Sequence, residues 1–445
     1  MKPKAEEETT KVIEYIDAFP FDGALAFSKA MMKTYGWTTP VPTPSFFGPR
    51  PPATIEIKIG YKETAKVIWG MFQIPGLEGT IETAPDWKSS PPRFVLVAEV
   101  KKKHEDRVRE LAALTRKIVA EDSIYKGKAV ILKTDENGDL NFKDGVDFLD
   151  LENVNGAELV LPKQIEVIVQ GALFVPIEQT DACRANRIPL KRGVLMAGPY
   201  GTGKTLPAFV TAKKCVENGW TFIYLDRVSA LDDALSFAKR YQPCAIFAED
   251  IDRAVTGDRS EDMDDILNTI DGIEAKSAEI ITILTTNHAE NINKAMLRPG
   301  RLDAIITFAA PDAEAVERLV RQYGRGLVPA SENLSEVGVA LAGNIPAVIR
   351  EVMERAKLFA LSLSPGQKIL LSSAAILAAT ASMKEHLEMM KEKKPLELDA
   401  DDAELGKHMR LAVGRGMNGT KEKVVEIHEL VVEIHELVAE IRNNQ

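Results

Sequence analysis

The most constraining feature of this chain is a glycine-rich segment at residues 198–205, with the sequence Gly-Pro-Tyr-Gly-Thr-Gly-Lys-Thr. It fits the spacing G-x-x-x-x-G-K-[ST] and follows an apolar run at residues 193–197, which we expect to be a strand. Glycines allow backbone N–H groups to turn toward phosphate oxygens, and a helix that starts behind the loop offers its positive end to the same anion. Lys204 can then reach the β- and γ-phosphates, and the Thr205 hydroxyl can ligate Mg²⁺. The alternative is a chance glycine-rich turn before a helix.

This reading predicts ATP and Mg²⁺ as the cofactors. We assign the loop and the first residues of the following helix to nucleotide binding: Gly198, Pro199, Tyr200, Gly201, Thr202, Gly203, Lys204, Thr205 and Leu206.

Two acidic residues end a second apolar run at residues 245–248. A nucleotide–Mg²⁺ site needs one carboxylate near the metal and another to orient or deprotonate the attacking water. The carboxyl ends of parallel strands are where α/β sheets bind ligands. By register we assign Glu249, with Thr205, to the metal and Asp250 to the catalytic base. Because Asp is one methylene shorter than Glu, the reverse assignment stays open, as does a plain solvated acidic loop.

Two weaker signals follow along the chain. Asn287 ends an apolar run and could hold the attacking water or touch the γ-phosphate, although an asparagine there is usually only a turn former. Arg298 and Arg301 flank a Pro-Gly pair and suit an arginine finger that stabilises transition-state charge. Alone, the arginine pair would more often be a surface loop.

The surrounding pattern predicts an α/β fold. Short apolar runs alternate with helical segments, at residues 193–197, 221–225, 245–248, 280–284 and 304–308. Strands of this kind imply a parallel sheet that helices cover on both faces. Residues 312–392 read as mostly helical.

The region before the glycine-rich loop reads as an α+β domain that carries no recognisable catalytic motif. We expect a short helix over residues 10–18, a Pro-rich linker over 39–52 and a charged amphipathic helix over 102–121. We expect strands at residues 54–59, 67–74, 94–100, 128–132 and 146–151.

Charge and composition exclude some functions. With 56 Lys and Arg against 66 Asp and Glu, the net charge is −10, which disfavours non-specific nucleic-acid binding without excluding a local basic patch. The three cysteines are widely spaced and indicate neither a zinc site nor a disulfide framework. No apolar run approaches the ~20 residues that span a bilayer, and the polar N-terminus is unlike a secretory signal. We therefore expect a soluble cytoplasmic protein without membrane contact.

Taken in this order, the four elements resemble those of the AAA family of ring ATPases. Residues 198–205 match its Walker A motif, 246–250 its Walker B motif and Asn287 its sensor 1. The resemblance implies a P-loop AAA+ module, with a doubly wound parallel sheet and a helical lid. It also implies a homo-oligomeric ring of six or seven subunits and ATP sites between subunits. By position, Arg298 and Arg301 would then act on the neighbouring subunit's ATP.

Within that family the core is most similar to Bcs1-like ATPases. The Glu249-Asp250 order reverses the usual Asp-Glu, residues 226–235 follow the second strand at once, and residues 285–288 read Thr-Thr-Asn-His. The chain departs from Bcs1 in lacking a transmembrane segment.

These readings give six expected regions. They are an N-terminal segment and linker (1–52), an α+β domain (53–156), the ATPase αβ subdomain (157–310), the helical lid (311–394), a linker (395–420) and a heptad-patterned, coiled-coil-like helix (421–445).

The expected activity is ATP hydrolysis coupled to remodelling or moving a protein partner of unknown identity. AAA unfoldases that thread their substrates carry an aromatic pore loop after the second strand, and residues 226–230 and 253–262 contain no aromatic residue. A folded partner, or a nucleotide switch, is therefore favoured. The alternatives are a nucleic-acid motor or loader on the same fold, and an ATP-binding scaffold with low turnover.

The last segment repeats one heptad. Residues 424–430 and 431–437 are both Val-Val-Glu-Ile-His-Glu-Leu, which places isoleucine at position a and leucine at d. We expect this stripe to self-associate and to support assembly. The alternative is a terminal helix that lies on its own subunit.

Overall fold

The computed structural model describes residues 8–36, 39–46, 48–142, 145–251, 278–288, 302–363 and 368–383. The chain divides into two compact units, residues 1–380 and 381–445, and the elements named below lie in the first unit apart from the end of α12. Among the described residues, no helix combines the length and the apolar character needed to cross a membrane.

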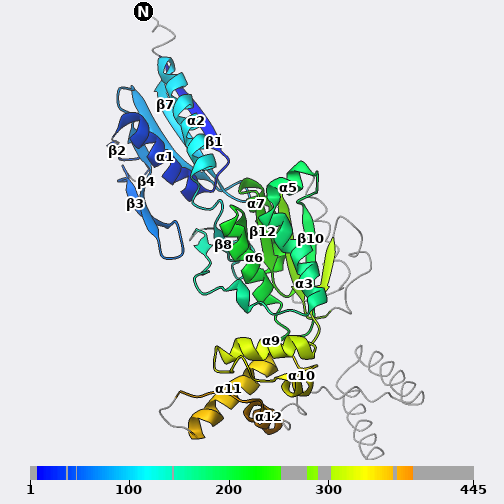
Figure 1. Cartoon of the computed structure of the whole chain (residues 1–445). Helices are drawn as coiled ribbons and strands as arrows, with labels where there is room; N and C mark the ends of the chain where they lie inside the picture. Colours follow the sequence, from blue (N-terminus) through cyan, green and yellow to red (C-terminus); the bar gives the residue numbers. More distant parts are fainter. Residues whose placement is uncertain are drawn as a thin grey trace, which may run out of the picture. The chain divides into compact units, whose positions relative to one another are not determined.

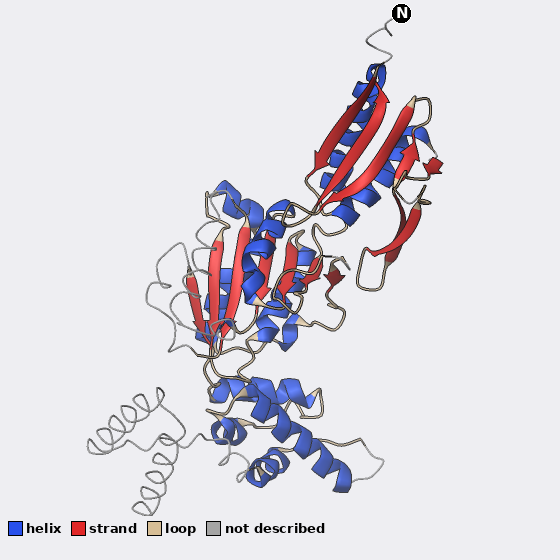
Figure 2. Cartoon of the chain, turned by 180° about the vertical axis from the view of Figure 1, so that it is seen from behind, coloured by secondary structure: helices blue, strands red, loops and turns tan. Residues whose placement is uncertain are grey.

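A seven-stranded sheet forms the centre of the region that contains the glycine-rich loop (Figures 1 and 2). Its strand order is β14-β10-β13-β12-β11-β8-β9, and every neighbouring pair is parallel except β8 and β9. The strands are β8 (Ala129–Leu132), β9 (Asp147–Phe148), β10 (Arg192–Ala197), β11 (Thr221–Leu225), β12 (Cys244–Ala248), β13 (Ile280–Thr286) and β14 (Ala304–Thr307).

Helices cover both faces of this sheet. Alternate residues of its central strands point to opposite sides, so the same strands contribute to a buried cluster on each face. On one side, Val194 and Phe247 share a buried cluster with α3 (Lys163–Val169) and α6 (Thr205–Glu217). On the other side, Leu195 and Ile246 share a cluster with α7 (Leu231–Arg240). The segment after α3 continues through a π-helical turn at Gln170–Phe174 into α4 (Val175–Glu178) and α5 (Thr180–Ala185). The predicted doubly wound α/β fold is confirmed.

A second sheet of five antiparallel strands has the order β1-β7-β6-β5-β2. Its strands are β1 (Thr9–Ile16), β2 (Thr39–Val41), β5 (Met71–Gln73), β6 (Gly79–Asp86) and β7 (Arg93–Lys101). Helices α1 (Pro20–Tyr35) and α2 (Glu105–Glu121) pack against each other and against this sheet. A separate hairpin pairs β3 (Ala53–Lys58) with β4 (Thr64–Trp69). The α+β character predicted for this region is therefore present.

The helix expected over residues 10–18 is wrong. These residues form β1, an edge strand that pairs with β7 along its whole length. Val12 and Ile16 are its buried side chains, and a spacing of four satisfies one face of a helix and one face of a strand equally well. The β-branched composition of the segment favours the strand. Helix α1, which comes directly after it, was not predicted.

Two expected domain boundaries also do not coincide with the limits of the sheets. The boundary after residue 52 cuts through one sheet, because β1 and β2 pair with strands that follow it. The strand expected at residues 128–132 belongs to the seven-stranded sheet, where β8 pairs in parallel with β11. Nearly every side chain of β8 is buried, which suits a strand inside a parallel sheet better than an edge of the first domain.

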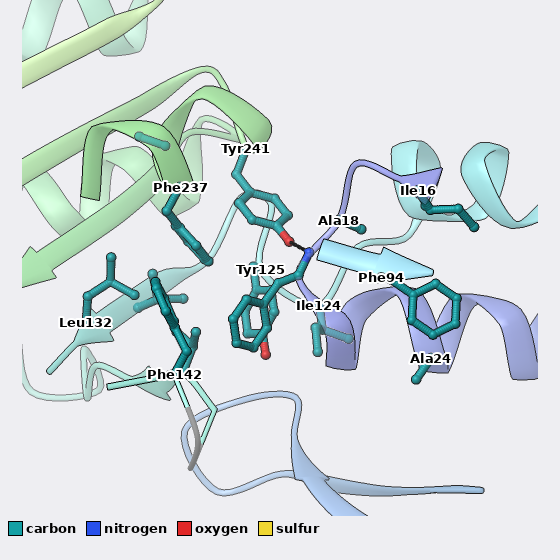
Figure 3. Close-up of a cluster of buried hydrophobic side chains, with 14 of the residues drawn as sticks. Ile16, Ala18, Ala24, Phe94, Ile124, Tyr125, Leu132, Phe142, Phe237 and Tyr241 are labelled. Atoms are coloured by element: carbon teal, nitrogen blue, oxygen red, sulfur yellow. Dashed lines mark hydrogen bonds between the residues drawn. The ribbon is translucent and has the colours of Figure 1, made fainter. Parts of the chain in front are cut away.

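A cluster of buried aromatic rings joins α1 to α7 (Figure 3). Phe19, at the start of α1, lies 6.0 Å from Phe237 of α7 between ring centroids. Its backbone N–H donates a 2.9 Å hydrogen bond to the hydroxyl of Tyr241. Tyr125 and Phe142 complete the cluster, each within 6.3 Å of the Phe237 ring centre. The two sheets are therefore connected by a packed and hydrogen-bonded contact.

The described residues after β14 form four helices: α9 (Ala313–Gly324), α10 (Ser335–Leu341), α11 (Pro346–Leu363) and α12 (Ser373–Ser382). Asp312 caps α9, accepting a 2.8 Å hydrogen bond from the backbone N–H of Ala315. The linker over 395–420 and the heptad segment over 421–445 lie outside the described residues, so their self-association stays a prediction.

Candidate nucleotide site

The glycine-rich loop connects the end of β10 to the first residue of α6. Its backbone needs conformations that side chains rarely adopt: Gly198 has a φ of 155° and Gly201 a φ of 77°. A Cβ atom at Gly198 would come within 2.4 Å of the carbonyl oxygen of Phe308. Glycine is therefore required where the loop leaves the sheet, and this folds the chain into a short turn at the N-terminus of α6.

Lys204 points back into this loop and is 8% exposed. Its ammonium donates hydrogen bonds to the carbonyl oxygens of Gly198 at 2.6 Å and Pro199 at 3.0 Å. A third bond, of 2.7 Å, reaches Oδ1 of Asn287 at the end of β13. A nearly buried cation at the N-terminus of a helix is an arrangement that attracts phosphate.

The two acids that follow β12 make different contacts. Oε1 of Glu249 accepts a 2.9 Å hydrogen bond from the Thr205 hydroxyl. Oδ1 of Asp250 accepts a 2.7 Å hydrogen bond from Nδ2 of Asn287, while the Asp250 backbone N–H donates to Oγ1 of Thr285 at 2.9 Å. Asp250 has a φ of 51°, an uncommon value for a residue with a side chain, and such strained residues gather at functional sites.

A pocket of about 420 Å³ opens over these groups. The sequence-predicted residues that line it are Tyr200, Gly201, Thr202, Gly203, Lys204, Thr205, Leu206, Glu249, Asp250 and Asn287. Gly198 and Pro199 do not line the pocket but hold the ammonium of Lys204 through their carbonyl oxygens. Arg298 and Arg301 lie outside the described residues.

The other wall of the pocket was not found by sequence reasoning. It consists of residues 158–161, Tyr323 of α9 and the start of α11, including Arg350. The Arg350 guanidinium carbon lies 5.1 Å from the centre of the Tyr323 ring. These residues are far apart in the chain and form no spaced motif, so only the fold brings them to one cavity.

The donors in this pocket fit a nucleoside triphosphate with a divalent cation. The ammonium of Lys204 and the loop amides suit phosphate oxygens, and Mg²⁺ prefers the oxygen ligands that Thr205 and Glu249 supply. Next to them, burial and then the Glu249 carboxylate raise the pKa of Tyr224 to about 12. Its phenol therefore stays a neutral hydrogen-bond donor beside this carboxylate.

Comparison with known proteins supports this interpretation. Residues 194–310 match the family described as "ATPase family associated with various cellular activities (AAA)". Residues 194–310 form an AAA domain. The match runs from within β10 to the residues just after β14, so it includes the glycine-rich loop, both acids and Asn287.

Several curated proteins are similar to part of this chain. The 26S proteasome regulatory subunit 6A of Schizosaccharomyces pombe is 32% identical over 37% of this chain and 41% of its own length. The 26S proteasome regulatory subunit 8 homolog of the same yeast is 28% identical over 57% of this chain and 66% of its own. The ATP-dependent zinc metalloprotease FtsH of Helicobacter pylori is 29% identical over 44% of this chain and 34% of its own. The chain thus spans 34 to 66% of the length of these relatives.

Proposed function

We propose that this chain is an ATP hydrolase that uses the energy of hydrolysis to remodel or move a protein partner. The observation that carries the proposal is the connected set of side chains at the ends of β12 and β13. Lys204 donates a hydrogen bond to Asn287, and Asn287 donates one to Asp250. Thr205 donates a hydrogen bond to Glu249, the residue before Asp250. A phosphate-binding cation, a candidate base and a metal-binding pair therefore face one pocket.

The geometry supports a division of labour for the hydrolysis step. Lys204 and the loop amides bind the β- and γ-phosphates, and Thr205 and Glu249 hold the cation. Mg²⁺, when bound, offsets the negative charge of the phosphate oxygens. Asp250 accepts a proton from the water that attacks the γ-phosphorus, and Asn287 fixes the orientation of that carboxylate. The bond between the γ-phosphorus and the bridging oxygen then breaks, releasing ADP and phosphate.

The reverse assignment of the acids is the alternative to this scheme. It would make Glu249 the base and Asp250 the metal partner. The hydrogen bond from Thr205 to Glu249 favours Glu249 as the metal partner. If the Thr205 hydroxyl oxygen ligates the metal, its proton needs an acceptor beside the metal, and Glu249 is that acceptor.

A homo-oligomeric ring of six or seven subunits is part of the proposal and rests on the resemblance to AAA ATPases. In such a ring Arg298 or Arg301 would stabilise transition-state charge on the neighbouring subunit's ATP, an effect worth about 10³–10⁵-fold in rate. Mixing Arg301→Ala with Lys204→Ala chains tests this, because a mixed interface can combine an intact loop with an intact arginine. We expect the mixture to regain part of the wild-type ATP turnover, whereas each variant alone should stay at its low rate.

A folded protein is the favoured partner. Two of the similar proteins are named as proteasome regulatory subunits and a third as a protease. The segment after β11 is short and is tied down, since both carboxylate oxygens of Asp226 accept a 3.0 Å hydrogen bond from the Thr134 backbone N–H. That suits a rigid surface better than a loop that grips an extended chain.

Other assignments are kept as competing outcomes. The Bcs1-like subfamily is proposed on the Glu249-Asp250 order and on residues 285–288. A nucleic-acid motor predicts salt-sensitive DNA or RNA binding, which the net charge of −10 disfavours. An ATP-binding scaffold predicts tight ATP binding with almost no phosphate release.

The function is tested by measuring ATP affinity and phosphate release on the same preparation. We expect wild-type protein to bind ATP and release phosphate, and Lys204→Ala to lose tight binding, because a charge-assisted hydrogen bond contributes roughly 1.5–3 kcal/mol. Lys213→Ala is a matched control, since Lys213 lies on the same helix and donates to the Val154 carbonyl oxygen at 2.8 Å. Wild-type affinity in Lys204→Ala would contradict the nucleotide site.

A further inference from the structure

We propose that Tyr224 is a positioning residue that holds the Glu249 carboxylate ready to receive Mg²⁺. The proposal rests on the function proposed above and adds a residue that no motif identified. The Tyr224 hydroxyl donates to Oε2 of Glu249 at 3.4 Å, while the Thr205 hydroxyl donates to Oε1 at 2.9 Å. The two oxygens of one carboxylate are thus each directed by a hydroxyl from a different element.

The register of the sheet explains how Tyr224 reaches this acid. In the parallel pairing of β11 with β12, Tyr224 lies opposite Phe247. Side chains two residues apart on a strand point to the same face. Glu249 is the first residue after β12, and its contact with the Tyr224 hydroxyl places its carboxylate on the same side as Phe247. Tyr224 is therefore the residue of the neighbouring strand whose side chain runs along the face toward Glu249.

Packing holds the phenol ring in place. The Tyr224 ring centre lies 5.7 Å from that of Phe247 and 6.4 Å from that of Phe209 on α6. A ring that is fixed on two sides loses little further freedom when its hydroxyl makes a hydrogen bond. The hydroxyl is therefore presented to Glu249 by the scaffold instead of being drawn there by the carboxylate.

A glutamate at this position needs such a support more than an aspartate would. Glu has one more rotatable bond than Asp, so a free Glu249 would sample carboxylate positions that do not suit the cation. Partners that orient a metal ligand typically change metal affinity when they are removed. An aspartate at position 249 would be one methylene shorter, and the bond to Tyr224 is already long at 3.4 Å. The tyrosine should therefore matter only when residue 249 is glutamate.

The test is a binding experiment, so it does not depend on turnover. A fluorescent ATP analogue is bound at a series of Mg²⁺ concentrations and, separately, in EDTA. For Tyr224→Phe we expect the Mg²⁺ concentration at half-maximal enhancement of binding to rise about three- to fivefold, in the lower part of the range for one hydrogen bond because this one is long at 3.4 Å. Affinity in EDTA should stay at the wild-type value, because the ring and its packing are retained.

Two controls make the result specific. Tyr35→Phe removes the same atom from α1 and should not change the Mg²⁺ dependence. In a Glu249→Asp background, adding Tyr224→Phe should change the Mg²⁺ half-saturation by less than about twofold, because the shorter carboxylate no longer reaches the hydroxyl.

The other outcomes are distinguishable. Unchanged Mg²⁺ dependence in Tyr224→Phe would overturn the positioning role, and so would an equal loss of affinity with and without Mg²⁺, which would indicate packing alone. An equally large effect in the Glu249→Asp background would also overturn it. If wild-type binding shows no Mg²⁺ dependence, the proposed function itself fails.

Discussion

Nδ2 of Asn287 donates a hydrogen bond to Oδ1 of Asp250 across 2.7 Å, which links the ends of β13 and β12. The oxygen of the same amide accepts from the Lys204 ammonium at 2.7 Å. The nitrogen and the oxygen of the Asn287 amide each make a hydrogen bond, so the orientation of the amide is fixed. The candidate base and the candidate phosphate-binding cation are therefore held by one side chain, although Asp250 follows Lys204 by 46 positions in the sequence.

Replacing this side chain should affect hydrolysis more than binding. In Asn287→Ala the Asp250 carboxylate loses the hydrogen bond from Asn287 that orients it, and we expect phosphate release to fall about 10²-fold or more. ATP affinity should fall less, by about tenfold or under, because Lys204 keeps its two carbonyl partners. Asn137→Ala, in an exposed turn, is the control. Equal losses in binding and in turnover would mean that Asn287 acts only through Lys204.

The junction between the two sheets should respond to pH through Asp22. This side chain is 1% exposed; Oδ2 accepts from the Ser123 hydroxyl at 2.7 Å and Oδ1 from the Ile124 backbone N–H at 3.1 Å. Burial raises the pKa of Asp22 from 3.8 to about 6, against the opposing effect of these hydrogen bonds. The folded state therefore binds more protons than the unfolded state between these values, and stability falls as the pH rises through this window.

We expect Asp22→Asn to remove this dependence, since the amide keeps an acceptor oxygen and carries no proton equilibrium. A pKa shift of this size corresponds to a cost on the order of 3 kcal/mol at neutral pH. The thermal midpoint of Asp22→Asn should exceed that of wild type by more at about pH 7.5 than at about pH 5. Glu136→Gln, at an exposed carboxylate, serves as the control. A difference that stays constant with pH would contradict the buried titration.

Tyr241 should stabilise the same junction through its hydroxyl. In Tyr241→Phe the buried backbone N–H of Phe19 loses its acceptor, which typically costs about 1–3 kcal/mol. The ring remains packed 4.8 Å from that of Phe237, so the loss should come from the hydroxyl alone. Denaturant unfolding measures the change in the free energy of unfolding, with Tyr35→Phe as the control. No loss of stability would mean that water or another group replaces the acceptor.

The seven-stranded sheet could be predicted because its central strands are apolar runs and the loop after β10 has a fixed spacing. β12 reads Cys-Ala-Ile-Phe-Ala and is buried throughout, which marks a strand covered on both faces. Lys204 was found from the spacing of the loop, and Glu249, Asp250 and Asn287 from their positions at strand ends. The hydrogen-bond partners of these residues could not be predicted, because the partners depend on which strands are neighbours in the sheet.

The first domain was harder to predict because its local signals are ambiguous. Val12 and Ile16 suit a helix as well as a strand, and the choice depends on β7, some 80 residues further along the chain. The far wall of the pocket could not be predicted either. Arg350 and Tyr323 belong to the helices after the sheet, and their facing the loop is a consequence of how those helices fold back.

The central claim is that Asp250 activates water in a Mg²⁺–ATP site, and the most direct test is the rate of phosphate release from bound ATP in Asp250→Asn. We expect ATP binding to be retained while hydrolysis falls about 10²–10⁴-fold, because the amide preserves the shape of the side chain but cannot accept the proton. Glu249→Gln, measured in parallel, should instead weaken the Mg²⁺ dependence of binding. Normal hydrolysis by Asp250→Asn, with turnover blocked and Mg²⁺ binding intact in Glu249→Gln, would contradict the account and reverse the two roles.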